Sequence, residues 1–201
     1  EMQRSLVGSE MCIRDSNIAS WLDKTEGLIM LTQEWGTCSG SDLFFFTPSQ
    51  KVRNLLFFST AVGYYFTDYD YHIERAYYPE YLLFYICDGR LSVRSENRTM
   101  VANAGQVGLL NCHRPHEYHT IGNTEFIWIH FCGSNTHEIY EQIVKLYGGY
   151  VFDTSNAKTI HDEIYSILHA CRHNQLMTEL QISFKLYGMM LSLLGLSLIH
   201  I

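Results

Sequence analysis

The feature that most constrains this chain is a change in the spacing of its apolar residues near Gly133. From Val52 to Phe131, short runs of β-branched and aromatic residues alternate with turn residues at close spacing, which is typical of an antiparallel sandwich or barrel. After Gly133 the apolar residues recur about every 3.6 positions, the period of an amphipathic helix. The sequence therefore predicts a mainly β domain followed by helices.

The predicted strands are Asn54–Phe58, Gly63–Phe66, Tyr81–Cys87, Leu91–Ser95, Thr99–Ala102, Val107–Leu110 and Phe126–Phe131. Turn residues separate several of them: Asp88-Gly89 is a tight hairpin signal, and Ser95–Asn97 and Asn103–Gly105 mark the next two turns. In the last strand, alternation places Phe126, Trp128 and His130 on one face and the intervening apolar residues on the other. One face of this strand is then wholly apolar, and the other is aromatic with a polar group.

Three helices are predicted after the strands. The first ends at Gly148-Gly149, the second begins near Ala157 with Ser155 or Asn156 as its N-cap, and the third covers Glu179–Leu194. The third helix is apolar on two sides, and such a helix needs two partners. One partner can be the domain itself, and we expect a second copy of the protein on the other side. The residues expected at that dimer interface are Leu180, Phe184, Tyr187, Leu191 and Leu194.

Composition narrows the function classes. The 201 residues are 47% hydrophobic and 17% charged, which suits one globular domain with a real core. The formal net charge is −7, and the 14 Lys and Arg residues are spread thinly, so this polypeptide is not expected to grip DNA. The six cysteines contain no C-x-x-C pair and are interpreted as reduced thiols. No apolar stretch is long enough to predict a membrane span.

Both ends of the chain resemble translated adapter sequence, over Arg4–Ser16 and Leu196–Ile201. We expect residues 1–29 to be a non-native or disordered leader and residues 196–201 to be a non-native tail. Met30 is then the expected native start, and the native protein is expected to continue past the C-terminal end.

The richest group of chemical side chains is Asn111–His119, which contains His113, His116 and His119. Three imidazoles can ligate a transition metal if they converge. Because Pro115 bends the chain between the first two, we favour turn and barrel-mouth histidines over a metal site, and we expect no cofactor. The chain also has no nucleophile elbow and no phosphate-binding glycine loop.

Arg75 and Trp128 are the other candidates for a ligand site. An arginine that enters an aromatic barrel offers a forked donor to sugar hydroxyls or to a carboxylate. From composition alone, a surface arginine paired with Glu74 or Glu80 is the favoured alternative. For Trp128 and Phe126, a place in the core is likewise favoured over a platform for a ligand.

Three segments, Tyr81–Arg90, Ala104–Tyr118 and Phe126–Gly133, closely resemble the sensor domain of AraC-family transcription regulators. The resemblance covers roughly residues 50 to 195. Within it, Gly105–His116 is similar to the turn-strand-Pro-His signature of cupins. By contrast, the region Asp88–Glu96 lacks the H-x-H motif of metal-dependent cupin enzymes, and Gln106 replaces their usual acidic residue.

The resemblance implies a cupin-like double-stranded β-helix (jelly roll) barrel over residues 30–133 and an antiparallel helical dimerisation segment over residues 134–195. It implies a cytoplasmic homodimer that binds a small effector, often a sugar, and reaches DNA only through a C-terminal helix-turn-helix module, absent here. Arg75, Tyr118, Phe126 and Trp128 fall where the arabinose-binding member contacts its sugar, although that member has a histidine at the position of Phe126. We add His116 and His130 to this expected ligand site.

The expected function is a sensor without enzymatic activity, and two alternatives to it stay open. One is a metal-dependent cupin enzyme acting on a small polar substrate, with His113, His116 and His119 around the metal. The other is a barrel without a ligand that serves only for dimerisation, in which Arg75 and Trp128 are structural.

Overall fold

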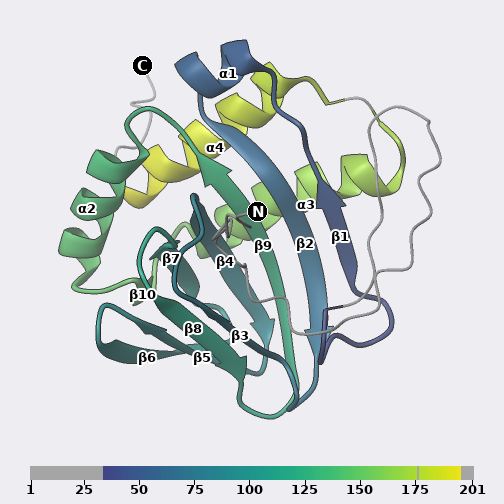
Figure 1. Cartoon of the computed structure of the whole chain (residues 1–201), viewed down its shortest axis with the longest axis vertical. Helices are drawn as coiled ribbons and strands as arrows, with labels where there is room; N and C mark the ends of the chain where they lie inside the picture. The colour runs from purple at the N-terminus through teal and green to yellow at the C-terminus, as the bar shows by residue number, and fades with distance from the viewer. Residues whose placement is uncertain (1–33, 176, 196–201) are drawn as a thin grey trace, which may run out of the picture.

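The computed structural model describes residues 34–175 and 177–195 (Figure 1). The leader predicted at residues 1–29 and the tail predicted at 196–201 lie outside the described residues. In chain order the elements are β1 (Asp42–Phe45), α1 (Gln50–Leu55), β2 (Phe58–Thr67), β3 (His72–Arg75), β4 (Tyr81–Asp88), β5 (Arg90–Ser95), β6 (Arg98–Asn103), β7 (Val107–Asn111), β8 (His116–Thr120), β9 (Thr124–Cys132), α2 (Thr136–Tyr147), β10 (Val151–Phe152), α3 (Ala157–Arg172) and α4 (Glu179–Leu193).

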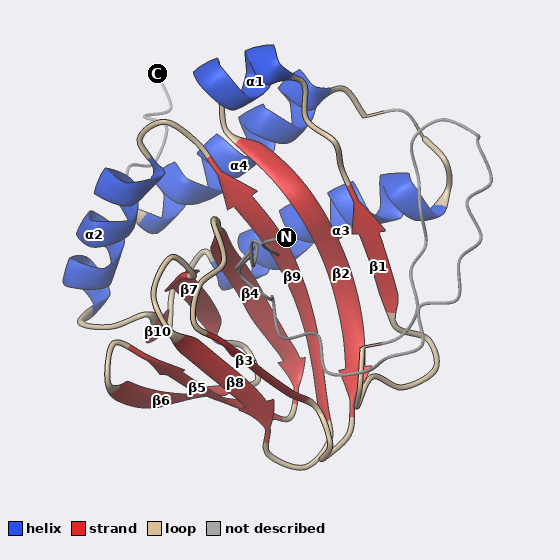
Figure 2. Cartoon of the chain, in the orientation of Figure 1, coloured by secondary structure: helices blue, strands red, loops and turns tan. Residues whose placement is uncertain are grey.

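The strands form two antiparallel sheets that face each other (Figure 2). The larger sheet has the order β1-β2-β9-β4-β7-β10, and the smaller has the order β3-β8-β5-β6. Helices α3 and α4 cover the outer face of the larger sheet, where they contact β2, β4 and β9. The mainly β fold class with C-terminal helices is therefore confirmed.

Strand β9 separates two hydrophobic cores, as its alternating sequence predicts. Ile127, Ile129 and Phe131 pack toward the helices. Phe126 and Trp128 face the interior of the barrel, between the two sheets. The face of β9 that carries Phe126 and Trp128 thus lines the barrel interior, which is the side that can hold a ligand.

The prediction of a strand over Asn54–Phe58 was wrong. Residues Gln50–Leu55 form the short helix α1, and β2 begins only at Phe58. The Ser49 side chain accepts a hydrogen bond from the Val52 backbone N–H and so caps the first turn. Val52 is the buried residue of this helix. A local cap and one buried contact outweigh the weak strand pattern of this segment.

The hairpin predicted at Asp88-Gly89 was also wrong. Strand β4 pairs with β7 and β9, whereas β5 pairs with β6 and β8, so this turn carries the chain from one sheet to the other. Gly89 has a φ of 77°, and a Cβ there would lie 2.2 Å from the Asn123 carbonyl oxygen. A side chain at this position would therefore clash where the chain crosses from one sheet to the other, and glycine avoids the clash. The turn at Ser95–Asn97 does join paired strands, and Glu96 and Asn97 both have positive φ, as a tight hairpin requires.

Four strands carry no sequence prediction: β1, β3, β8 and β10. Strand β8 shows why, because its sequence His-Glu-Tyr-His-Thr contains no β-branched apolar run. Its residues nevertheless alternate between buried and half-buried, with His116, Tyr118 and Thr120 turned inward. Strand β10 pairs with β7 from within residues 134–195, so one strand of the larger sheet comes from the segment expected to be helical.

The predicted helices are all present. Gly148 ends α2 with a φ of 72°, Asn156 precedes α3, and Thr178 caps α4 in a capping box with Gln181. No helix in residues 34–175 or 177–195 is both long enough and apolar enough to cross a bilayer.

Three of the five residues predicted at a dimer interface lie on the exposed side of α4. Leu180, Phe184 and Tyr187 are 65%, 79% and 40% exposed. Leu191 and Leu194 are half-buried, and Leu194 packs against the helix-side core. The other side of α4 is buried in that core. The dimer interface itself stays a prediction.

Candidate ligand-binding site

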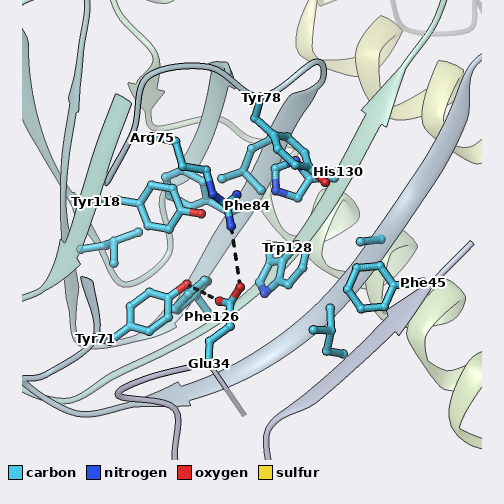
Figure 3. Close-up of a pocket in the computed structure, with 14 residues that line it drawn as sticks. Glu34, Phe45, Tyr71, Arg75, Tyr78, Phe84, Tyr118, Phe126, Trp128 and His130 are labelled. Atoms are coloured by element: carbon cyan, nitrogen blue, oxygen red, sulfur yellow. Dashed lines mark hydrogen bonds and ion pairs between the residues drawn. The ribbon is translucent and has the colours of Figure 1, made fainter. Parts of the chain in front are cut away.

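A cavity of about 90 Å³ lies inside the barrel between the two sheets (Figure 3). Its walls come from β1, β2, β4 and β9 of the larger sheet and from β3, β5 and β8 of the smaller one. The lining residues are Glu34, Leu43, Phe45, Ala61, Tyr71, Arg75, Tyr78, Leu82, Phe84, Leu91, Tyr118, Phe126, Trp128 and His130.

The structure brings most of the predicted site residues together in this cavity. Arg75, Tyr118, Phe126, Trp128 and His130 all line it. They come from β3 and from the consecutive strands β8 and β9, which lie about 40 residues further along the chain. The expected ligand site thus corresponds to one cavity, although its ligand stays a prediction.

His116 does not line this cavity. It borders a neighbouring groove of about 370 Å³ on the other side of Arg75, together with Arg94, Glu96 and Pro115. Its Nδ1 lies 2.8 Å from the Arg114 carbonyl oxygen. The residue begins β8, so although it turns inward it sits at the end of the barrel rather than at its centre.

Arg75 is held inside the barrel and not on the surface. Strand β3 alternates, with His72 and Glu74 exposed and Ile73 and Arg75 half-buried. The Arg75 guanidinium lies 5.0 Å above the Tyr78 ring, and its Nη2 is 3.8 Å from Glu34 Oε1. A surface arginine paired with Glu74 or Glu80, the favoured alternative from composition, is therefore incorrect.

Those two glutamates have other partners. Glu74 pairs with Arg94, whose Nη2 lies 3.3 Å from Glu74 Oε1. Glu80 is buried and accepts a hydrogen bond from the Thr60 hydroxyl. Burial raises the pKa of Glu80, while the bond from Thr60 opposes this shift.

Glu34 is a cavity residue that no sequence pattern selects. It reaches the barrel from the segment before β1, and the Tyr71 hydroxyl lies 3.5 Å from its Oε2 (Figure 3). Burial raises the pKa of the Glu34 carboxyl, and the positive charge of Arg75 partly offsets this. A lone glutamate far from the strand pattern carries no local signal of this position.

Aromatic rings in contact with one another form part of the cavity wall. Tyr65 makes edge-to-face contacts with Phe126 and Trp128, at centroid distances of 5.7 and 5.2 Å. Gly63 lies opposite Trp128 in the β2–β9 register, and a Cβ at Gly63 would fall 2.6 Å from the indole ring. The absence of a side chain at this glycine gives Trp128 its place against the sheet.

Trp128 also supplies a polar atom. Its Nε1 is buried and has no hydrogen-bond partner among the described residues. Figure 3 shows this nitrogen turned toward the Glu34 carboxylate. An indole N–H is a donor only, so it suits a hydroxyl or carbonyl oxygen of a ligand.

His130 is the polar group at the far end of the cavity. Its Nδ1 lies 3.8 Å from Glu80 Oε2, and its ring packs 4.7 Å from Tyr78. Burial, with smaller effects of Arg75 and His116, lowers the pKa of His130 to about 3. His130 is therefore neutral near pH 7 and acts there as a hydrogen-bonding group, not as a cation.

The three histidines of the metal alternative point in different directions. His113 lies on the turn before β8, with both its backbone N–H and Nδ1 close to Asn111 Oδ1. His119 turns outward, where Nδ1 is 3.7 Å from Glu117 Oε1, whereas His116 turns inward. Among residues 34–175 and 177–195, no three His, Cys, Asp or Glu side chains gather as metal ligands would.

The sequence matches the family described as the AraC-like ligand binding domain over residues 60–187. The chain belongs to this family. The matched region runs from β2 into α4 and contains every cavity residue from Ala61 onward. Glu34, Leu43 and Phe45, which also line the cavity, precede it. The barrel of this AraC-like domain is thus completed by a segment outside the matched region.

Solved structures with a similar barrel are distant from this AraC-like domain. The protein YhaK from Escherichia coli is 14% identical with a TM-score of 0.42, and the match covers 49% of this chain and 47% of that chain. A cupin superfamily protein from Desulfitobacterium hafniense is 11% identical with a TM-score of 0.36, over 47% and 80% of the two chains. An HTH_3 family transcriptional regulator from Vibrio cholerae is 9% identical with a TM-score of 0.37, over 47% and 52%.

Matches at this level carry no argument about what this AraC-like domain binds, and the chain spans less than half the length of YhaK. No curated protein matches the sequence. The family and the cavity are therefore the basis for a function.

Proposed function

We propose that this AraC-like domain is the effector-sensing and dimerisation part of a cytoplasmic transcription regulator, that it is not an enzyme, and that its effector is a small sugar or sugar derivative. The observation that carries the ligand proposal is the composition of the cavity. A charged pair, Arg75 and Glu34, faces an aromatic wall that includes Trp128. Sugars combine hydroxyls that need such donors and acceptors with an apolar ring face that stacks on an aromatic side chain.

Because the cavity is small, the proposal requires the barrel to change shape when a ligand binds. A cavity of about 150 Å³ holds one benzene molecule, whereas this one measures about 90 Å³. A whole sugar ring needs more room than this volume gives, and in the proposal part of the wall moves outward as the sugar binds. Strand β1 is suited to this because it is an edge strand paired with β2 alone, and it contributes Leu43 and Phe45 to the lining.

In this proposal the helices transmit ligand binding to the dimer. In the proposed regulator, two copies pair through the exposed apolar side of α4, and ligand occupancy of the barrel biases how they are arranged. Such coupling requires that the ligand bind the two arrangements with different affinities. DNA is reached only through a further helix-turn-helix module, in keeping with the net charge of −7.

A thermal-shift titration of the purified protein with a panel of neutral sugars tests the proposal. We expect one or more sugars to raise Tm in a dose-dependent way. Arg75→Ala and Trp128→Phe should abolish or weaken the shift, because they remove the forked donor and the indole N–H. Arg94→Ala, an exposed arginine on the outer side of β5, is the matched control and should leave the shift unchanged.

Metal analysis of the same sample tests the enzyme alternative. Stoichiometric bound metal without any response to sugars would overturn the sensor proposal in favour of a metal-dependent cupin enzyme. The separate directions of His113, His116 and His119 give no support to that alternative.

A further inference from the structure

The cavity already contains an anion of its own. The Glu34 carboxylate lines the cavity, with Oε1 3.8 Å from Arg75 Nη2 and Oε2 3.5 Å from the Tyr71 hydroxyl. The segment that carries Glu34 precedes β1, so this carboxylate is added to the barrel from outside its strands. The position beside an arginine guanidinium is the one that the carboxylate of a ligand would occupy.

The charges of the cavity lining balance. Glu34 supplies the acidic side chain of the described lining and Arg75 its permanent cation, and the positive charge 3.8 Å away favours the ionised form of the carboxyl. His130, the other lining residue that can carry a charge near neutrality, is buried, and burial keeps it neutral near pH 7. No described lining residue adds a second cation. An anionic ligand would therefore leave the cavity with a net negative charge, whereas a neutral one would not.

The geometry of the Glu34–Arg75 pair leaves both side chains able to hydrogen-bond with hydroxyl groups of a ligand. At 3.8 Å, Glu34 and Arg75 are attracted by charge but lie beyond normal hydrogen-bond distance. Trp128 Nε1 adds an unpartnered donor beside them, among the described residues. A neutral hydroxyl can donate to the carboxylate and accept from the guanidinium or the indole. A second carboxylate at the same place would meet Glu34 in a partly buried cavity, where the repulsion is stronger than in bulk water.

We propose that Glu34 is a specificity-determining residue that occupies the anion position at Arg75, so that the cavity admits neutral polyhydroxy ligands and excludes carboxylated ones. This inference rests on the proposed function in one respect, namely that the barrel cavity is the effector site. Glu34, which lies outside the strands, would then reject anionic analogues of the ligand by charge repulsion.

The test compares the wild-type chain with Glu34→Gln by calorimetric titration, using acetate, D-galacturonate and D-galactose as probes. Galactose and galacturonate differ at one carbon, which is a hydroxymethyl group in the first and a carboxylate in the second. Because like charges across a binding site suppress association, we expect the affinity of Glu34→Gln for acetate and galacturonate to rise ~10-fold or more over wild type. The double variant Glu34→Gln/Arg75→Ala should lose this gain.

Glu74→Gln is the matched control, since Glu74 lies on β3 next to Arg75 but turns outward to Arg94. It should bind the acids no better than wild type does. A thermal melt of each variant checks that it folds.

The inference is overturned if Glu34→Gln binds acetate and galacturonate no better than wild type, or if wild type binds either acid as tightly as the variant does. Failure of the sugar proposal gives a different pattern. If galactose and the other neutral sugars bind neither protein, the proposed effector class is wrong, while the acetate titrations still decide whether Glu34 keeps carboxylates away from Arg75.

Discussion

Burial, more than any neighbouring charge, controls the protonation of His130. The side chain is almost fully enclosed between Tyr78, Trp128 and Glu80, and its pKa is lowered to about 3. A carboxylate 3.8 Å away would ordinarily favour the protonated ring. Glu80 does not do so here because burial raises its own pKa, and Arg75 acts on His130 in the opposite sense. At the scale of single residues, the barrel thus holds a neutral histidine.

This protonation state predicts how stability depends on pH. The unfolded chain protonates His130 below its ordinary pKa of about 6.5, whereas the folded chain stays neutral down to about 3. Between these values the unfolded state binds more protons, so acid lowers the free energy of unfolding. The loss attributable to His130 from pH 7 to pH 5 should be about 2 kcal/mol.

Urea unfolding of wild type and His130→Gln at pH 7 and pH 5 measures this loss. We expect the variant to lose less stability than wild type over the same interval. The raised pKa values of Glu34 and Glu80 act in the opposite direction, since those carboxyls take up protons in the folded state, but both groups are present in both proteins. Equal losses in the two proteins would show that His130 is not held neutral.

One side chain joins the edge strand of the cavity to the helices. The Arg172 guanidinium at the end of α3 donates to Asp42 at the start of β1 and lies over the rings of Tyr64 and Tyr165. The pair is mostly buried, so it is screened less than a surface ion pair. At the scale of elements, this contact ties the movable edge strand β1 to the helix layer that carries the proposed output.

Removal of this contact should loosen β1 selectively. Arg172→Met leaves Asp42 without its cation, and we expect a loss of about 1 kcal/mol in the free energy of unfolding. Amide hydrogen exchange should become faster in β1 while the exchange of β4 and β9 stays unchanged. Arg94→Met, which removes an exposed cation from the other sheet, serves as the control. Unchanged exchange in β1 would mean that Arg172 does not hold this strand.

At the scale of the whole molecule, exposed apolar side chains of the described residues follow one another along α4, where a partner would explain them. Leu180, Phe184 and Tyr187 form an exposed apolar row on α4, whose opposite side is buried in the core. Exposed aromatic residues that cluster on one face are typical of protein interfaces. The proposed homodimer would cover this row.

Light scattering coupled to gel filtration tests the assembly. Phe184→Glu places a charge in the middle of the row, and we expect it to weaken dimerisation ~30-fold or more, as loss of a buried anchor of ~2 kcal/mol would. Tyr69→Glu is the matched control, because Tyr69 is similarly exposed at 78% but lies on the turn between β2 and β3. A Phe184→Glu protein that dimerises like wild type would exclude this face of α4 from the interface.

Local chemistry determined much of this protein. The two-residue alternation of β9 assigned Trp128 to the barrel interior, and the 3.6-residue period after Gly133 located the helices. These signals are readable because each depends on the spacing of neighbours in the chain and on the burial of one face. Trp128 could be selected for the same reason, because it lies in a predicted strand. Arg75 lies outside the predicted strands, and only its position in the family resemblance placed it in the site.

Tertiary structure alone decided what completes the cavity. Glu34 reaches it from before β1, and strand β8 is polar enough that only its pairing with β3 and β5 makes it a strand. The turn at Gly89 became a crossing between sheets because of where β5 finds its partners. Such features depend on contacts between residues distant in sequence, and the free energy of those contacts has no counterpart in any local pattern.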